Sequence, residues 1–165
     1  MLHPAIVVRQ AGAVHASGLF AEELIPEGTV VWTLQDPTYT WEEIQSWSIE
    51  KRRYFKWYGF QCGVNRYAVP YDDSREANHS CRPNMLWLGS DSLVSRWDVQ
   101  PGEELTYDYA SSDITLPMEF RCDCGVKGCR KQITHLDYLH PDWQEQYGEN
   151  LPPHVLEAIS RARRV

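Results

Sequence analysis

Residues 121–130 read RCDCGVKGCR and carry three closely spaced cysteines, Cys122, Cys124 and Cys129. This spacing suits a metal site better than a disulfide framework, and the two glycines permit the tight bends of a metal-binding loop. Charged residues separate the cysteines, so the segment would make a poor apolar core for buried free thiols. Structural Zn²⁺ normally takes four ligands, which leaves Cys62 or Cys81 to supply the fourth thiolate. An iron–sulfur cluster is the alternative metal group.

Two further segments lie on the N-terminal side of this cluster. Residues 75–84, REANHSCRPN, form a polar stretch between two apolar runs, which read alone is a polar loop. Residues 102–109, GEELTYDY, begin with a turn and place Tyr107 and Tyr109 two positions apart. On a strand such residues point to the same side, where tyrosines more often pack in a sheet than take part in catalysis.

The composition describes an ordinary globular chain. With 165 residues, 42% hydrophobic and 24% charged, it fits one domain, and its 12% aromatic content argues against disorder. The net charge of −7 disfavours nucleic acid and favours basic partners. No apolar run reaches the roughly 18 residues that cross a bilayer, and the first residues lack the pattern of a signal peptide. We therefore expect an intracellular protein that does not bind a membrane.

Periodicity predicts short strands with few helices. Thr40 and Glu43 form a capping box at the start of one helix, and a second helix is expected over Ser48–Trp57. A third short helix is expected around Val155–Ile159. Turns are expected at Gly and Pro, and strands over the runs between them that are rich in β-forming residues or alternate in polarity. The expected strands are residues 7–8, 18–21, 29–34, 60–69, 84–88, 93–94 and 105–109.

In this order and spacing, the three motifs resemble those of the SET-domain protein lysine methyltransferases. Residues 78–84 are similar to the family's Asn-His-Ser-Cys-x-Pro-Asn motif, and residues 102–109 to its Gly-Glu-Glu-Leu-x-Tyr-Asp-Tyr motif. The cysteines of residues 122–129 are similar to its post-SET zinc motif. Residues 16–21 and 25–28 resemble the family's first strands. Agreement of four motifs in the right order is improbable by chance.

The resemblance implies a mainly β, SET-domain (β-clip) fold. It consists of small curved sheets with a pseudoknot, a short helical insertion near residues 40–58, a zinc-binding post-SET cap and a short C-terminal helix. The implied divisions are a SET domain over residues 5–110, a post-SET segment over 118–134 and a C-terminal extension over 135–165.

The resemblance also assigns roles to individual residues. Tyr109 matches the catalytic tyrosine, and Tyr107 the position that tunes how many methyl groups are added. Cys81 would be the fourth zinc ligand beside the three clustered cysteines. S-adenosylmethionine would be bound by Ser17, Gly18, Leu19, Asn78, His79 and Gln132. Residues 130–133 would cover the cofactor and complete the lysine channel.

Three positions depart from the family pattern. Ala16 stands where many members have glycine, and Leu34-Gln35-Asp36 where many have Tyr-x-Gly with an active-site tyrosine. That tyrosine is either absent or replaced; the candidates are Tyr39, Tyr54 and Tyr58. Glu76-Ala77 stands where Phe followed by Ile or Val is common.

The implied function is S-adenosylmethionine-dependent lysine N-methylation of a basic protein such as a histone. Because the Tyr107 hydroxyl occupies space beside the amine, we expect mono- or dimethylation. The departures from the pattern motivate an alternative, a catalytically weak or inactive zinc-stapled module that binds peptide or protein. A zinc-binding regulator of nucleic acid is a third reading. The compartment would be the cytoplasm in a prokaryote, and the nucleus in a eukaryote or when the protein acts on a host's chromatin.

Two charged runs bear on the partner. Residues 98–113 hold five carboxylates and no Lys or Arg, so they either attract a basic peptide or form a solvated acidic edge. Residues 121–131 are basic and would be the place to touch nucleic acid, which we expect to be an unlikely partner.

Overall fold

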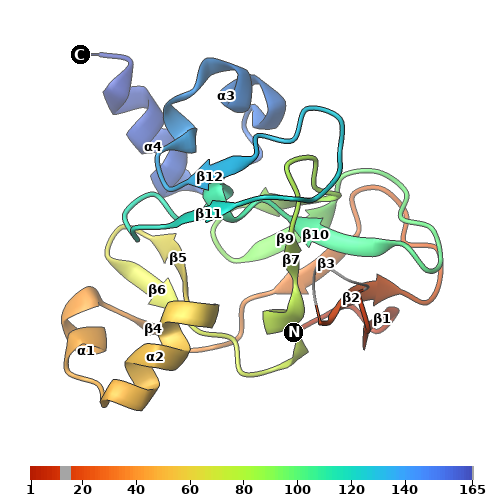
Figure 1. The fold of residues 1–165 in the computed structure, drawn as a ribbon, viewed down its shortest axis with the longest axis horizontal. Coiled ribbons are helices and arrows are strands. Elements are labelled where there is room, and N and C mark those ends of the chain that lie inside the picture. The colour runs from red at the N-terminus through yellow and green to blue at the C-terminus, as the bar shows by residue number, and fades with distance from the viewer. Residues whose placement is uncertain (12–15, 165) are drawn as a thin grey trace.

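The computed structural model of the chain describes residues 1–11 and 16–164, whose strands form four small sheets (Figure 1). One has the order β1 (Ile6–Arg9), β2 (Gly18–Ala21), β10 (Glu104–Tyr107), β7 (Asn78–His79). The second has the order β3 (Val30–Thr33), β9 (Ser92–Ser95), β8 (Met85–Leu88), and the third β4 (Thr38–Tyr39), β6 (Arg66–Ala68), β5 (Phe60–Gly63). The fourth pairs β11 (Glu119–Arg121) with β12 (Gln132–Thr134). The expected mainly β fold is confirmed.

Helices occupy two places. α1 (Trp41–Gln45) and α2 (Ile49–Tyr58) form the insertion, and α3 (Pro141–Tyr147) and α4 (Pro153–Ala162) end the chain. Short 3₁₀ turns cover η1 (Asp73–Glu76), η2 (Tyr109–Ser111) and η3 (Asp137–Leu139). In Figure 1 the insertion lies at the lower left, while α3, α4 and the β11–β12 hairpin lie at the top. Among the described residues, no helix is both long enough and apolar enough to span a bilayer.

The two insertion helices begin where their caps predict. The Thr40 hydroxyl accepts a hydrogen bond from Glu43 N at 3.3 Å, and the Glu43 carboxylate accepts one from Thr40 N at 2.7 Å. Ser48 caps α2 by accepting from Lys51 N. These bonds satisfy backbone donors that have no partner within a first helical turn, so the capping box and the second helix are both confirmed.

β10 lies at the centre of the fold. It pairs antiparallel with β2 and parallel with β7, and Asn84 supports it from a third direction. The Asn84 side chain donates to Glu104 O at 2.8 Å and accepts from Thr106 N at 2.8 Å, so it completes backbone pairing that a strand would otherwise supply. Residues 78–84 therefore lie alongside β10, and the threading of this segment beneath another loop in a pseudoknot stays a prediction.

The expectation that Tyr107 and Tyr109 share a strand is wrong. β10 ends at Tyr107, and Tyr109 begins the turn η2, where the Asp108 carboxylate accepts from Ala110 N at 3.1 Å. This short side-chain bond competes with strand continuation. The two rings nevertheless lie together, with centroids 4.9 Å apart.

Three hydrophobic clusters fill the molecule. The first lies between the sheets of β1–β2–β10 and β3–β9–β8, and the third lies under α1 and α2. The second joins Cys81 and Cys122 to Trp143 and Tyr147 of α3 and to α4, so residues 118–134 and 135–165 share one core. A single C-terminal helix was expected, and α3 is an addition. Pro141 occupies its first turn, but seven residues are too few for a clear helical period.

Candidate active site and metal centre

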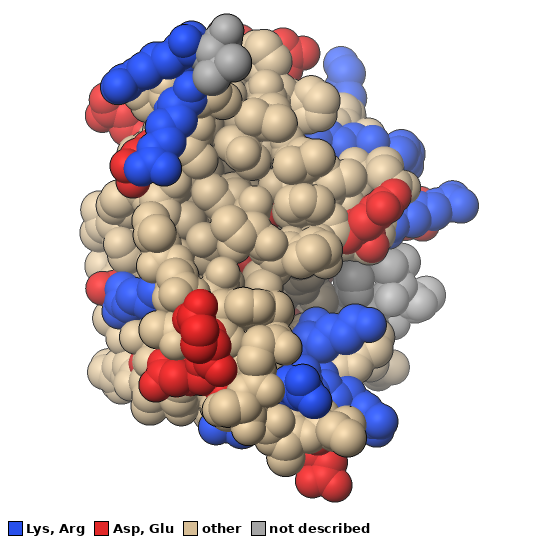
Figure 2. Space-filling view, turned by 90° about the vertical axis from the view of Figure 1, so that its left-hand side faces the viewer, with Lys and Arg blue, Asp and Glu red and all other residues tan. Residues whose placement is uncertain are grey.

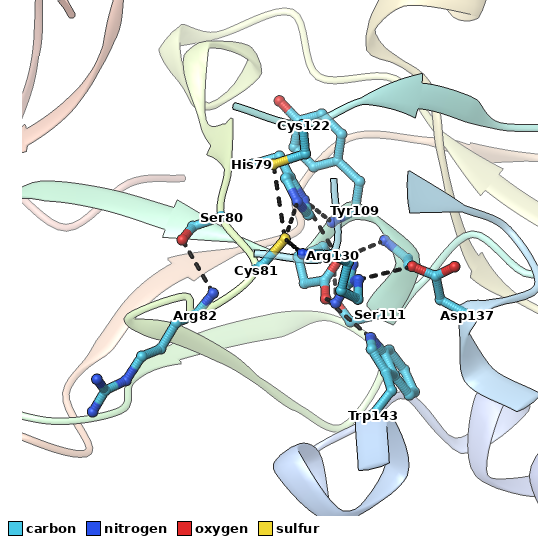
Figure 3. Close-up of polar contacts among 12 residues, drawn as sticks. His79, Ser80, Cys81, Arg82, Tyr109, Ser111, Cys122, Arg130, Asp137 and Trp143 are labelled. Atoms are coloured by element: carbon cyan, nitrogen blue, oxygen red, sulfur yellow. Dashed lines mark hydrogen bonds and ion pairs between the residues drawn. The ribbon is translucent and has the colours of Figure 1, made fainter. Parts of the chain in front are cut away.

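Four cysteines converge at the junction of β7, the β11–β12 hairpin and the C-terminal core. The sulfurs of Cys81, Cys122, Cys124 and Cys129 all lie within 4.8 Å of one another. Figure 3 shows Cys81 between His79, Cys122 and the backbone of Arg130, whose N–H donates to the Cys81 sulfur at 3.4 Å. Cys62 lies instead in the first hydrophobic cluster. The geometry thus selects Cys81 as the fourth member of the set.

The cluster fits a tetrahedral zinc ion. Zn–S bonds of about 2.3 Å place the sulfurs of such a site about 3.8 Å apart. The Cys81 sulfur lies 3.8 Å from that of Cys122 and 3.9 Å from that of Cys129. Gly125 and Gly128 take φ values of 74° and 84°, which L side chains rarely adopt, so the loop needs glycine at both positions.

Burial makes Cys81 and Cys122 poor thiolates without a cation, whereas hydrogen bonds lower the pKa of the Cys124 thiol to about 7. Burial raises the pKa of the Cys81 thiol and raises that of Cys122 to about 11. A bound metal would displace these protons, because thiolate is the form that coordinates.

A cavity of about 810 Å³ opens between the insertion and the β11–β12 hairpin. Its size lies in the range of small-molecule sites. Aromatic side chains dominate the lining; they are Trp32, Trp41, Phe55, Trp57, Tyr58, Phe60, Trp87, Tyr107, Tyr109 and Phe120. Figure 2 shows the side that carries α1, α2 and α4, where the surface between the helical insertion below and the C-terminal helix above is largely uncharged.

Tyr109 is fixed in this lining by its hydroxyl and its ring. The hydroxyl donates to Ala77 O at 2.8 Å. The ring contacts those of His79 and Phe120, with centroids 5.3 and 5.8 Å away. Burial raises the pKa of Tyr109, and also that of Tyr107, so both phenols stay protonated at neutral pH. The site therefore presents two neutral hydroxyl groups in an aromatic wall.

The predicted cofactor residues of β2 and β7 meet beside Tyr109. Asn78 donates to Ser17 O at 2.7 Å and to the Glu104 carboxylate at 2.7 Å. A Cβ on Gly18 would lie 2.3 Å from a Glu104 carboxylate oxygen, so a larger residue there would displace the Glu104 side chain from its contact with Asn78. Leu19 is buried and lines the cavity.

His79 and Gln132, two further predicted cofactor residues, occupy different surroundings. The buried His79 ring lines the cavity, and its Nδ1 accepts from Tyr109 N at 3.3 Å. Gln132 on β12 is exposed, and its amide donates to Glu119 at 2.9 Å. Glu119 lines the cavity, whereas Gln132 does not.

A buried carboxylate between the two tyrosines connects them to the C-terminal core. Asp108 accepts from both Arg130 guanidinium nitrogens at 2.5 and 2.8 Å, from Trp143 Nε1 at 3.0 Å and from the Tyr147 hydroxyl at 2.7 Å. Burial alone would raise the pKa of Asp108, but the hydrogen bonds and charge of Arg130 lower it. Arg130 Nε also lies 2.9 Å from Asp137, and Figure 3 shows Trp143 and Asp137 around this guanidinium.

Sequence reasoning missed this network. It placed Arg130 in a basic run that covers the cofactor or touches nucleic acid, whereas its guanidinium points inward to two carboxylates. Trp143 and Tyr147, four residues apart after Pro141, were the available signal for a helix with one buried face.

Comparisons with known proteins agree with this geometry. The SET domain family model matches residues 16–110, more than half of the chain. The chain belongs to the SET domain family. An H3 lysine-4 specific histone-lysine N-methyltransferase of Mycosarcoma maydis is 31% identical in an alignment of 142 positions that covers 72% of this chain and 9% of that protein. The chain thus spans less than a tenth of that relative.

Two solved structures support the SET fold. The methyltransferase domain of human histone-lysine N-methyltransferase SETMAR has a TM-score of 0.59 at 23% identity, over 79% of this chain and 57% of that one. KRYPTONITE, solved with mCHG DNA and SAH, has a TM-score of 0.59 at 22% identity, over 77% of this chain and 28% of that one.

The structure shows what the residues that depart from the SET pattern contact. Glu76 accepts a hydrogen bond from the Ser17 hydroxyl, so this departure contacts a predicted cofactor residue. Leu34 packs against the first hydrophobic cluster. Of the three candidate replacements for the missing tyrosine, Tyr58 lines the cavity; Tyr39 packs on Trp47, and Tyr54 donates to Pro70 O.

The acidic run of residues 98–113 does not form one exposed surface, although Asp98 is exposed. Asp108 and Asp113 are buried, and Glu103 and Glu104 accept hydrogen bonds from Asn84 and Asn78. Among the described lining residues, the exposed charged ones are Arg52, Lys56, Arg75 and Glu119. The expectation of a continuous acidic surface is therefore wrong, because the fold uses the carboxylates of Asp108 and Asp113 internally.

We expect Cys124→Ser to lose bound metal and cavity order together, because the cysteine cluster and the C-terminal helices share one core. Metal analysis of the purified variant checks the first effect, and protease sensitivity of residues 118–164 checks the second. Cys62→Ala, which removes a thiol remote from the cluster, should retain the metal. A Cys124→Ser variant with a full metal content would contradict the assignment.

The buried carboxyl group of Asp113 makes the stability of the protein depend on pH. Burial raises the pKa of Asp113 from 3.8 to about 7. The folded state therefore binds one proton more than the unfolded chain between about pH 4 and pH 7, and stability falls as pH rises through this window. The side chain in Asp113→Asn cannot ionise. Near neutral pH the free energy of unfolding of this variant should therefore exceed that of the wild type by about a few kcal/mol. The difference should shrink toward about pH 4, where the wild-type carboxyl group is also neutral.

Urea unfolding at several pH values measures this difference. Glu149→Gln removes one carboxylate from an exposed position and serves as the control. Parallel curves for the wild type and Asp113→Asn across the window would contradict the raised pKa.

Proposed function

We propose that the protein is an S-adenosylmethionine-dependent protein-lysine N-methyltransferase. The observation that carries this proposal is the position of Tyr107 and Tyr109 in an aromatic cavity, directly beside the Asn78-His79 segment. Support also comes from the family membership and from the name of the Mycosarcoma maydis relative. KRYPTONITE was solved with SAH, which supports the cofactor assignment.

Methylation of lysine needs a neutral amine held in line with an electrophilic methyl group. Positioning supplies most of such a rate enhancement. A lysine in water has a pKa of about 10.4 and is mostly charged. The aromatic lining disfavours the charged form, because burial lowers the pKa of an amine.

The cofactor, when bound, supplies the methyl group. Ser17, Gly18 and Asn78 would hold it from β2 and β7, on the side of the site where Tyr109 is fixed to Ala77 O. The Tyr109 hydroxyl would orient the amine through a lone pair, because its own proton is given to that carbonyl.

We propose mono- or dimethylation as the product. The Tyr107 ring lies 4.9 Å from that of Tyr109, and a protonated phenol there takes up room beside the amine. Each added methyl group needs the space that this hydroxyl would fill.

The proposed substrate is a basic protein such as a histone. The name of the relative, H3 lysine-4 specific, and the net charge of −7 support this class. We expect nucleic acid to be a poor partner, since Arg130 in the basic segment binds carboxylates internally and Arg121 pairs with Asp123. The competing function is a zinc-stapled binding module without turnover.

Calorimetric titration of the metal-replete protein with S-adenosylmethionine and S-adenosylhomocysteine tests the proposal. We expect both to bind, and Asn78→Ala to abolish binding because it removes the bond to Ser17. Transfer of labelled methyl to a core histone mixture then tests the substrate class. Absence of binding of either ligand would reject the enzyme in favour of the binding module.

We expect Tyr109→Phe to bind the cofactor normally and to lose about a hundredfold or more in rate, the scale on which a single positioned polar group contributes. The ring contacts with His79 and Phe120 remain in this variant, so cofactor affinity is the internal control. Single-turnover methyl transfer measures the rate. An unchanged rate would remove the hydroxyl from the reaction.

A further inference from the structure

One buried carboxylate of the cavity has no role in the arrangement described so far. Asp113 is 6% exposed and lines the cavity together with Tyr107 and Tyr109. The other carboxylate in the described lining, Glu119, is exposed. Asp113 is therefore the acidic group that an entering side chain meets within the aromatic wall.

The fold holds Asp113 firmly. Its Oδ1 accepts from Gln61 N of β5 at 2.6 Å. The Gln61 side chain in turn accepts from Ile114 N at 3.2 Å and Thr115 N at 3.1 Å, so residues 113–115 are clamped to β5. Such rigidity is what a group needs in order to contact a ligand in one geometry.

The second oxygen remains available. Within the described part of the chain, Oδ2 of Asp113 accepts no hydrogen bond. It is not one of the fully buried side-chain atoms without a partner, so it keeps contact with solvent. A carboxylate oxygen in such a place is complemented best by a cation that donates a hydrogen bond. The cation that enters a lysine methyltransferase is the side-chain ammonium of the target lysine.

We propose that Asp113 is a catalytic residue whose Oδ2 binds the ammonium group of the target lysine and accepts its proton. This inference rests on the proposed function. In the step, one N–H bond of the ammonium breaks, its electron pair stays on the nitrogen, and the proton forms an O–H bond with Oδ2. The products are a neutral amine beside Tyr107 and Tyr109 and a neutral carboxylic acid, which returns the proton to solvent in the cavity.

The surroundings of Asp113 suit such an exchange. Tyr107 and Tyr109 face it as neutral phenols, and Cys62 of β5 is a neutral thiol because burial raises its pKa to about 11. His154 Nε2 of α4 donates to the adjacent Ser112 O at 2.8 Å, and burial lowers the pKa of this histidine. Burial of Asp113 itself raises its pKa to about 7, near the pH at which a proton acceptor is most effective.

The pH dependence of kcat/KM tests the proposal, with a core histone mixture as acceptor. Asp113→Asn retains an oxygen for the Gln61 N–H but cannot take a proton. At about pH 7 we expect a loss of about tenfold or more, the scale of general-base catalysis. The loss should narrow toward about pH 9.5, where solution supplies the neutral amine. Glu149→Gln should follow the wild type, and all three should bind S-adenosylmethionine equally. Superimposable profiles for the wild type and Asp113→Asn would overturn the proposal.

A binding measurement separates this proposal from the proposed function. n-Butylamine mimics the end of a lysine side chain and is titrated by NMR into the metal-replete protein at about pH 8, where the amine is charged. We expect Asp113→Asn to bind n-butylamine at least about tenfold more weakly than the wild type does. Uncharged n-butanol should bind weakly, and with the same affinity, to both proteins. Equal affinity of both proteins for n-butylamine would reject Asp113 as the ammonium site, whether or not the wild type methylates protein.

Discussion

The carboxylate of Asp108 is the point on which the active site depends. It lies between the two tyrosines, and its partners come from the post-SET loop through Arg130 and from α3 through Trp143 and Tyr147. Removing a charge from water is expensive unless all its lone pairs are used, and here they are. The C-terminal helices are therefore part of the scaffold of the candidate active site, and the wall that holds Tyr109 extends into residues that the family model does not match.

The metal cluster and Asp108 act on the same junction. Cys81 lies two residues after β7, which pairs with the end of β10 next to Asp108, and Arg130 follows Cys129. A metal held by Cys81 and Cys129 would therefore fix both ends of the Arg130–Asp108 contact. The Arg130 N–H also donates to the Cys81 sulfur. A hydrogen bond of this kind stabilises negative charge on a ligand sulfur. The cysteine cluster, Arg130 and the buried carboxylate are thus neighbours, and a metal bound by the cysteines would join them in one electrostatic unit.

Much of the architecture could be predicted from the sequence because its signals are local. The capping box at Thr40, the glycine turns and the cysteine spacing each act within a few residues. The roles of Arg130, Trp143 and Asp113 could not be predicted in this way. Arg130 and Trp143 both bind Asp108, and Asp113 binds Gln61, which lies 52 positions away in the sequence. A charged residue in a polar run looks solvated until the fold brings a partner to it, and this is also why the acidic run was misread.

The position of β10 has a consequence for how the chain reaches its native state. This strand pairs with β2, which lies more than 80 positions earlier, and with β7 in parallel, so it has no adjacent hairpin partner. Long chain closures of this kind form slowly, because their entropy must be lost before any contact compensates for it. The α1–α2 insertion and the β11–β12 hairpin can form early, because their contacts join residues that are close in the sequence. Tyr107 at the end of β10 and Tyr109 just after it reach their environment late, so the candidate active site is assembled only when nearly all of the molecule is folded.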